Sequence, residues 1–293
     1  MTRPLSSSLK NNKTIRILLD AENRGYGIVA PIAYNIEHII AFTRAAEAKR
    51  SPLIIQFFPW AITFSDGLLI HAGAHAAKNA SVPIAIHLDH AQDEALIRHA
   101  ADTLPFDSIM VDMSHHEKED NLALTKELVA YCHERGIATE AEPGRIEGGE
   151  DGVADTSALD LGGVMTTRED VEDFVATGVD TLAPAFGNVH GKYGPKGPCL
   201  DWERLEFVRT LTKGRVRIAV HGTNDFSEEL MRKCIKGGVS KVNINKSALE
   251  GYLEHRREWA TKLPLTRLME EGVELVVKAM ERQMDICWSS GKA

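Results

Sequence analysis

Ionisable side chains follow short apolar runs of this sequence at positions where they could bind a metal ion. The segment IAIHLDHA (84–91) begins as an apolar run and ends with Asp89 and His90 close together. His190 and His221 follow two later apolar runs, and each of them precedes a glycine. Three imidazoles that leave a fourth position open are a ligand set of catalytic zinc sites. We therefore expect these three histidines to form a metal site.

Two carboxylates stand at similar positions in the sequence. Asp112 lies near the end of the run DSIMVDMS, and Glu142 lies near the end of IATEAEP. Such carboxylates could orient the imidazoles by hydrogen bonding, or they could bind a second cation. His87 lies two residues before Asp89, and we expect it to support the site from inside the protein rather than to bind metal.

Eight apolar runs alternate with segments of helical periodicity. The runs cover residues 27–33, 52–58, 82–89, 107–114, 137–143, 181–187, 217–222 and 241–245. Most are continuously apolar, as in strands that are covered on both faces. Helices are expected at 35–49, at 117–135, near 201–213 after Asp201, and after Ser227. The pattern favours a closed (β/α)8 TIM barrel over a doubly wound sheet, which often carries a G-x-G-x-x-G turn that this sequence lacks.

We expect one barrel domain over residues 1–293. Residues 1–14 would form a polar N-terminal tail, and residues 266–293 would add a C-terminal helical extension. Two connections, 144–166 and 187–200, are too long for plain turns and are typical of lids or binding loops.

A barrel would bring the ionisable residues together, because its catalytic groups lie at the C-terminal ends of the strands. His90, His190 and His221 would then converge from strands 3, 6 and 7. The loops after strands 7 and 8 are the usual phosphate site of this fold. Here they read HGTND and NINKS, and Gly191 and Gly222 would let a ligand approach backbone N–H groups. Alternatively, these glycines only form turns.

Composition limits the kind of partner. The formal net charge is −8, which argues against a nucleic-acid surface. No apolar run reaches the roughly 18 residues of a membrane span, and the N-terminus lacks the apolar core of a secretory signal. The four cysteines form no C-x-x-C pair, so a cytoplasmic location without disulfides is expected.

Several motifs together resemble one enzyme family. In order, VPIAIHLDHA, TEAEPGRIEGGEDGV and GNVHGKYGPKGPCLDWERL are similar to segments of the class II, metal-dependent ketose-bisphosphate aldolases. The similarity extends from about residue 27 to the end of the chain. It implies a zinc-dependent lyase of glycolysis or related carbohydrate metabolism. Such an enzyme cleaves a ketose 1,6-bisphosphate, such as fructose 1,6-bisphosphate, into dihydroxyacetone phosphate and an aldehyde.

The resemblance also implies residue roles. His90, His190 and His221 would bind Zn²⁺ or another divalent metal, with Asp112 and Glu142 at an alternative metal position. Asp89 would act as acid and base at the C4 hydroxyl, Glu150 would exchange the proton of the enediolate carbon, and Asn243 would contact the enediolate. The substrate-binding positions would be Gly191, Gly222, Thr223, Asn224, Asn243, Ile244, Asn245 and Lys246. The resemblance leaves open whether a monovalent cation also helps to bind the phosphate. It suggests a homodimer or a larger homo-oligomer.

The sequence departs from the family pattern at the substrate. Asn224 replaces a phosphate-binding serine, and Lys246 replaces a threonine, although a lysine could still bind phosphate as a point charge. Phe58 and Ile32 replace polar residues after strands 2 and 1. The catalytic set is intact while the binding set differs, so we expect an aldolase with a changed substrate preference.

Two other functions are compatible with the fold. A metal-dependent hydrolase on this barrel would more naturally carry an H-x-H pair on strand 1, which GIVAPIA lacks. A non-catalytic regulator that binds a metabolite would be distinguished by loss of a metal ligand, Asp89 or Glu150. None of these residues is lost.

Overall fold

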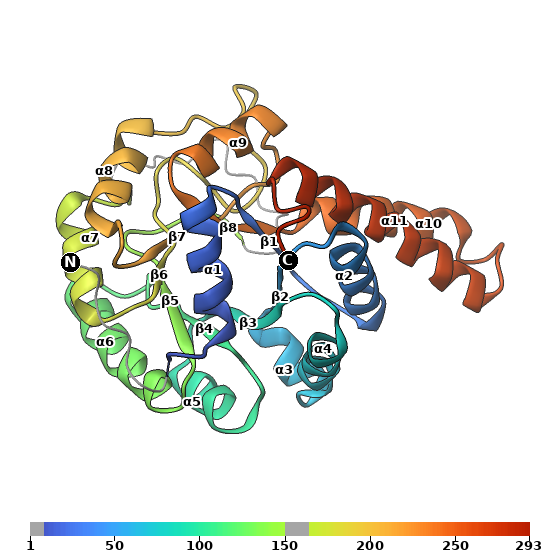
Figure 1. Ribbon diagram of the computed structural model, residues 1–293, viewed down its shortest axis with the longest axis horizontal. Coiled ribbons are helices and arrows are strands. Elements are labelled where there is room, and N and C mark those ends of the chain that lie inside the picture. The colour runs from blue at the N-terminus through green and yellow to red at the C-terminus, as the bar shows by residue number, and fades with distance from the viewer. Residues whose placement is uncertain (1–8, 150–163) are drawn as a thin grey trace.

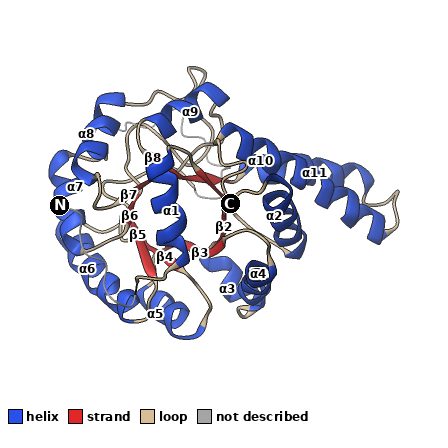
Figure 2. Ribbon diagram, in the orientation of Figure 1, coloured by secondary structure: helices blue, strands red, loops and turns tan. Residues whose placement is uncertain are grey.

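The computed structural model describes residues 9–149 and 164–293. Its centre is a closed barrel of eight parallel strands in sequence order, with β8 paired to β1 (Figure 2). The strands are β1 Ile28–Pro31, β2 Leu53–Phe57, β3 Ile84–Ala91, β4 Ser108–Val111, β5 Ala138–Ala141, β6 Thr181–Leu182, β7 Arg217–Val220 and β8 Val239–Ile244. All strand positions except Asn243 are buried, which explains why the runs are continuously apolar. The predicted TIM barrel is confirmed.

Helices surround the barrel (Figure 1). They are α1 Lys13–Arg24, α2 Ile36–Lys49, α3 Pro59–Ser65, α4 Leu68–Asn79, α5 Glu94–Thr103, α6 Lys118–Glu134, α7 Arg168–Thr177, α8 Trp202–Thr212, α9 Glu228–Lys236, α10 Lys246–Trp259 and α11 Leu265–Ile286. Two of the expected helices are capped by the residue that precedes them: the side chain of Asp201 accepts a hydrogen bond from Arg204 N, and that of Ser227 from Leu230 N. Within the described ranges, no helix is long and apolar enough to cross a membrane.

The N-terminal segment is more ordered than a polar tail. Helix α1 begins at Lys13, inside the expected 1–14 tail, and lies across one end of the barrel (Figure 1). The side-chain amide of Asn12 donates to the carbonyls of Asp107 and Gly136, while Leu9 is buried. Asn12 also caps α1 by accepting from Ile15 N. Residues 9–14 therefore belong to the packed structure, because Asn12 fixes them to loops at the start of β4 and β5.

Strand β6 is much shorter than the run 181–187 predicted. Ala183 N still donates to Ala141 O of β5, but beyond it the backbone is bound by loop groups: Ala185 N donates to Thr166 Oγ1, and Phe186 N donates to Asn188 Oδ1. These side chains replace a neighbouring strand, so the chain turns early toward the segment that carries His190.

The expected C-terminal helices are present. Helices α10 and α11 extend away from the barrel, and α11 packs against both α10 and α2 (Figure 1). A buried carboxylate ties this unit to α2: Glu37 accepts hydrogen bonds from Tyr252 and Arg256 of α10. The C-terminal helices are thus anchored beside the barrel end that carries the functional residues.

Candidate metal centre

One residue of β3 breaks the regular strand geometry. Neighbouring side chains of a strand normally point to opposite faces, yet Asp89 and His90 both line the same pocket. His90 has φ of 50°, and the register with β4 shifts between Leu88 and Ala91. The left-handed residue and the bulge turn both side chains toward the rim. The chain therefore leaves regular strand geometry at His90.

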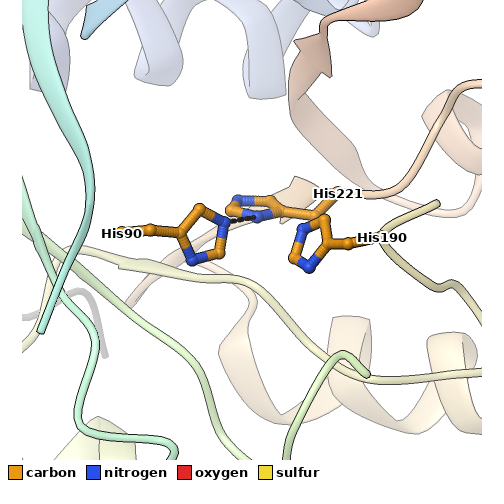
Figure 3. A group of neighbouring side chains, drawn as sticks. All are labelled: His90, His190 and His221. Carbon is orange, nitrogen blue, oxygen red and sulfur yellow. Dashed lines mark hydrogen bonds between the residues drawn. The ribbon is translucent and has the colours of Figure 1, made fainter. Parts of the chain in front are cut away.

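The three histidines converge on one point (Figure 3). One ring nitrogen from each of His90, His190 and His221 lies within 4.8 Å of the other two. His90 Nε2 and His221 Nδ1 are 3.0 Å apart. In a tetrahedral zinc site with metal–nitrogen distances of about 2.0–2.1 Å, two ligand nitrogens lie about 3.3 Å apart. Small side-chain shifts would therefore suffice for this set to bind a divalent ion.

Carboxylates fix the orientation of two imidazoles. Asp112 Oδ2 lies 2.8 Å from His90 Nδ1, and Glu140 Oε1 lies 2.8 Å from His221 Nε2. Because a carboxylate can only accept, these ring nitrogens are the protonated donors. The opposite nitrogens face the centre, where His90 Nε2 and His221 Nδ1 share a proton across 3.0 Å. A bound metal ion would replace that proton, because a metal binds the deprotonated nitrogen.

The charges around His90 favour a cation. Burial by itself would lower the pKa of His90, but the negative charges of Asp89, Asp112 and Glu142 outweigh it and raise the pKa to about 10. Burial and the neighbouring imidazoles hold the pKa of His190 well below its usual value. The donor set and its surplus of negative charge both fit a bound divalent metal.

A buried lysine lies beneath the histidines. Lys241 Nζ is 2.8 Å from Glu140 Oε2 and 3.5 Å from His87 Nε2. His87 Nδ1 in turn lies 2.7 Å from Ser108 Oγ, so His87 is an interior support as expected. His87, Asp89 and Glu140 also have metal-like spacing. However, the ammonium group of Lys241 already lies against both carboxylates of this second group, 2.8 Å from Glu140 and 3.7 Å from Asp89, so we do not regard it as a metal site.

Asp89 is an ionised carboxylate that faces the pocket. Burial would raise its pKa, but the charges of Lys241 and His90 outweigh burial and lower the pKa well below its usual value. Asn243 Nδ2 lies 3.1 Å from Asp89 Oδ2. Among the described residues, the buried Oδ1 of Asn243 has no hydrogen-bond partner. This corner of the pocket therefore offers a base and a free acceptor to a polar ligand.

Most of the predicted site residues line one pocket. Its walls are Ile32, Phe58, Asp89, His90, Gly149, His190, Gly191, Gly222, Thr223, Asn224, Asn243, Ile244 and Asn245. Lys246 is not in this wall, because its Nζ pairs with Asp225 at 3.0 Å. Asp112 and Glu142 lie behind His90. Glu150 lies outside the described residues, although its neighbour Gly149 is in the wall.

The loops that carry His190 and His221 are in close contact. Gly222 has φ of +68°, and a Cβ atom built on it would lie 2.2 Å from the carbonyl oxygen of Val189. The hydroxyl of Tyr193 donates to Gly222 O at 2.8 Å and accepts from Val189 N at 3.0 Å. Gly222 thus has a structural role as well as a predicted binding role, since it allows the two histidine loops to pack together.

Sequence reasoning missed two parts of the site. It did not single out Lys241, although a lysine between the apolar residues Val239 and Val242 of a strand is a signal that could have been used. It also did not anticipate that Tyr34 and Trp60 join Phe58 beside the metal centre. Tyr34 and Phe58 lie in loops and Trp60 in the first turn of α3, and the sequence pattern does not specify how these segments meet.

The fold and the rim chemistry define a TIM-barrel enzyme of the metal-dependent type. The family model for "Fructose-bisphosphate aldolase class-II" matches residues 12–292. A fructose-bisphosphate aldolase of Streptococcus pneumoniae is 32% identical, with 93% of this chain and 96% of the relative covered. The chain belongs to the class II fructose-bisphosphate aldolase family, whose members are metal-dependent aldehyde-lyases. The family implies a phosphorylated sugar as substrate.

Solved structures agree with this assignment. A Coccidioides immitis protein, provisionally described as a fructose-1,6-bisphosphate aldolase, is 54% identical with a TM-score of 0.92, covering 97% of this chain and 99% of that one. The YdjI aldolase of Escherichia coli K12 is 28% identical with a TM-score of 0.82, covering 96% and 98%. The barrel and its C-terminal helices are therefore shared with solved proteins that are described as aldolases.

Proposed function

We propose that this enzyme cleaves a ketose 1,6-bisphosphate of the fructose 1,6-bisphosphate type, with a changed substrate preference, into dihydroxyacetone phosphate and an aldehyde. One observation carries the proposal. The left-handed residue at His90 brings the carboxylate of Asp89 into the same pocket as three convergent imidazoles. A base beside a metal site is what carbon–carbon cleavage next to a carbonyl group requires.

We infer that His90, His190 and His221 bind Zn²⁺. Three neutral imidazole nitrogens are a preferred zinc environment, and Asp112 and Glu140 hold two of the rings in the required orientation. When bound, the ion would supply a Lewis acid beside the ketose carbonyl and stabilise the negative charge that develops on cleavage.

Asp89 is assigned the role of the base at the C4 hydroxyl. Two observations support this role: the low pKa of Asp89 keeps it ionised, and Asp89 lines the pocket that contains the three imidazoles. Removal of the hydroxyl proton turns C4 into an aldehyde while the C3–C4 bonding electrons pass to the ketone half. Asn243 would donate its amide hydrogens to Asp89 and to the oxygen of the resulting enediolate.

The remaining steps involve loop residues. Glu150 is assigned to return a proton to C3 of the enediolate, which gives dihydroxyacetone phosphate. Gly191, Gly222, Thr223 and Asn224 are assigned to the phosphate, because they line the wall beside His190 and His221. Backbone N–H groups in glycine loops are suitable donors to phosphate oxygens. Ile244, Asn245 and Lys246 would complete this side at the start of α10.

We also infer a homodimer or larger homo-oligomer. The α10–α11 unit exposes a row of large apolar side chains that a monomer would leave in water, namely Leu253, Trp259, Leu265, Met269 and Leu275. Extended exposed apolar surfaces of this kind are typical of subunit interfaces.

The experiment that tests the proposed chemistry follows the C–H exchange of dihydroxyacetone phosphate. We expect the enzyme to exchange one C3 hydrogen for solvent deuterium, as read by proton NMR without any aldehyde. A chelator should abolish the exchange, and Zn²⁺ should restore it. Exchange that persists in protein shown to be free of metal would contradict the mechanism.

A further inference from the structure

A second cavity adjoins the metal centre. It has a volume of about 440 Å³, and its walls are Tyr34, Phe58, Pro59, Trp60, His90, Gln92, Asp93 and Leu96. Two of these residues, Phe58 and His90, also line the pocket that contains the three histidines and Asp89. The cavity is therefore a continuation of the catalytic pocket rather than a separate surface feature.

The cavity and the glycine loops lie on different sides of the metal centre. Its walls follow the ends of β1, β2 and β3, whereas Gly191 and Gly222 follow β6 and β7. A substrate whose phosphate contacts the glycine loops, and whose reacting carbons lie beside Asp89, would direct its other end toward this cavity. In an aldolase that other end is the aldehyde half.

The side of the cavity that faces β1 and β2 is aromatic. The ring centroid of Tyr34 is 6.2 Å from that of Phe58 and 6.3 Å from that of Trp60. The Tyr34 hydroxyl donates to Asn245 Oδ1 at 3.1 Å. This hydrogen bond fixes the Tyr34 ring, which follows β1, to the end of β8. Trp60 is 45% exposed. This wall can bury an apolar group of a ligand, with Trp60 available to cover it.

The cavity lacks groups that would bind a phosphate. Its eight wall residues include no lysine or arginine, and its one carboxylate is Asp93. Asp93 is held in place as the N-cap of α5, where its Oδ1 accepts from Leu96 N at 2.7 Å. A phosphate group that extends into the cavity would find no lysine or arginine there and would meet the like charge of Asp93, which is unfavourable.

We propose, on the basis of the aldol function above, that this cavity selects uncharged aldehydes with an apolar or aromatic tail over phosphorylated aldehydes. In the addition direction, dihydroxyacetone phosphate loses a C3 proton to a base and its C3 attacks the aldehyde carbon. The electron pair of the aldehyde C=O then takes a proton and becomes the C4 hydroxyl. The tail of the aldehyde lies against Tyr34, Phe58 and Trp60 throughout.

The direct test compares two aldehydes as acceptor substrates of the wild-type, zinc-loaded enzyme. Dihydroxyacetone phosphate is supplied with either 3-phenylpropanal or glyceraldehyde 3-phosphate, and kcat/KM for each aldehyde is measured from product formation. We expect at least a tenfold preference for 3-phenylpropanal. Equal values, or a preference for glyceraldehyde 3-phosphate, would overturn the inference.

Asp93→Asn tests the charge of the cavity without loss of the cap, because asparagine is an equally good N-cap. We expect kcat/KM for glyceraldehyde 3-phosphate to rise several-fold, while that for 3-phenylpropanal stays within twofold. Asp201→Asn is the matched control, since Asp201 caps α8 in the same way and is not a wall residue of the cavity. An unchanged acceptor ratio in Asp93→Asn, or the same change in both variants, would contradict the assignment.

Trp60→Ala tests the aromatic wall, and Trp60→Phe is its conservative partner. The alanine variant should lower kcat/KM for 3-phenylpropanal about tenfold while that for glyceraldehyde 3-phosphate changes less, and phenylalanine should recover most of the loss. Equal losses for both aldehydes would contradict a role in selection.

Deuterium exchange of dihydroxyacetone phosphate needs no aldehyde, so it tests the proposed function separately from the acceptor preference. If exchange occurs but the enzyme does not prefer 3-phenylpropanal, this inference alone is refuted. If exchange does not occur, the proposed function is refuted as well.

Discussion

At the scale of single residues, the site depends on the conformation of His90. A residue other than glycine with positive φ costs on the order of 1–3 kcal/mol and persists only where its surroundings enforce it. Here the hydrogen bond between His90 Nδ1 and Asp112 and the bulge against β4 provide that support. The result is that two consecutive residues, a base and a metal ligand, reach one pocket.

Asp89→Asn should separate the two halves of the reaction. Without a base at the C4 hydroxyl, we expect kcat for ketose cleavage to fall by about 10²- to 10⁴-fold. Deuterium exchange at C3 of dihydroxyacetone phosphate should continue, because it needs the metal and another base. Steady-state kinetics and NMR measure the two rates. If exchange is lost together with cleavage while zinc still binds, the role assigned to Asp89 is wrong.

Glu140→Gln should weaken the metal site from behind. Glu140 orients His221 and neutralises Lys241, and loss of such partners typically costs about 10- to 100-fold in metal affinity. Competition with a fluorescent zinc chelator measures the affinity. Glu37→Gln is the matched control, because Glu37 is also buried and hydrogen-bonded but lies at the contact between α2 and α10. Equal affinities in the two variants would show that Glu140 has no positioning role.

At the scale of elements, the loops after β6 and β7 act as a unit. Tyr193 and Asn188 of the first loop hydrogen-bond to the backbone of Gly222 and His221. The close approach at Gly222 leaves no space for a side chain. The positions of His190 and His221 are thus linked through the backbone as well as through any bound ion.

Gly222→Ala should therefore displace both histidine loops. We expect a loss of zinc affinity together with a lower melting temperature, since the new Cβ would overlap the carbonyl of Val189. Gly197→Ala isolates the backbone effect, because Gly197 also has φ of +68° but has open space around it. That control should cost only about 1–2 kcal/mol of stability with normal zinc binding. Normal zinc binding in Gly222→Ala would contradict the coupling.

Sequence reasoning predicts elements and rim residues better than loops. The continuous apolar runs are sufficient to predict the barrel, since parallel strands are buried on both faces. The strand-end rule then brings His90, His190, His221 and Asp89 together. It does not place Lys246, which pairs with Asp225 outside the pocket wall. Salt bridges and aromatic contacts between loops depend on tertiary geometry. The hydrophobic periodicity of a sequence predicts helices and strands, but it does not predict such contacts.

At the scale of the whole molecule, the barrel carries a helical arm formed by α10 and α11 (Figure 1). The arm is joined to α2 by the ion pair between Arg256 and the buried Glu37, and it exposes large apolar residues along its length. Helix α10 begins directly after Asn245, a residue of the pocket wall. Association through the arm would therefore be transmitted to one side of the active site.

A charged substitution on the arm should change the oligomeric state of the protein. If subunits associate through it, Leu265→Asp should shift the protein to a smaller species without loss of secondary structure. Light scattering coupled to size-exclusion chromatography measures the mass, and circular dichroism checks the fold. Leu68→Asp on α4, an equally exposed leucine away from the arm, should leave the mass unchanged. A wild-type protein that is monomeric at micromolar concentration would exclude the proposed assembly.

The account as a whole depends on a metal bound by three imidazoles at the rim of the barrel. Zinc K-edge X-ray absorption on the zinc-loaded protein tests this claim most directly. We predict a first shell of three imidazole nitrogens at about 2.0–2.1 Å with one or two oxygen neighbours. His190→Ala should lose one imidazole from this shell. A shell of oxygen atoms alone, or one containing sulfur, would contradict the metal centre built by His90, His190 and His221.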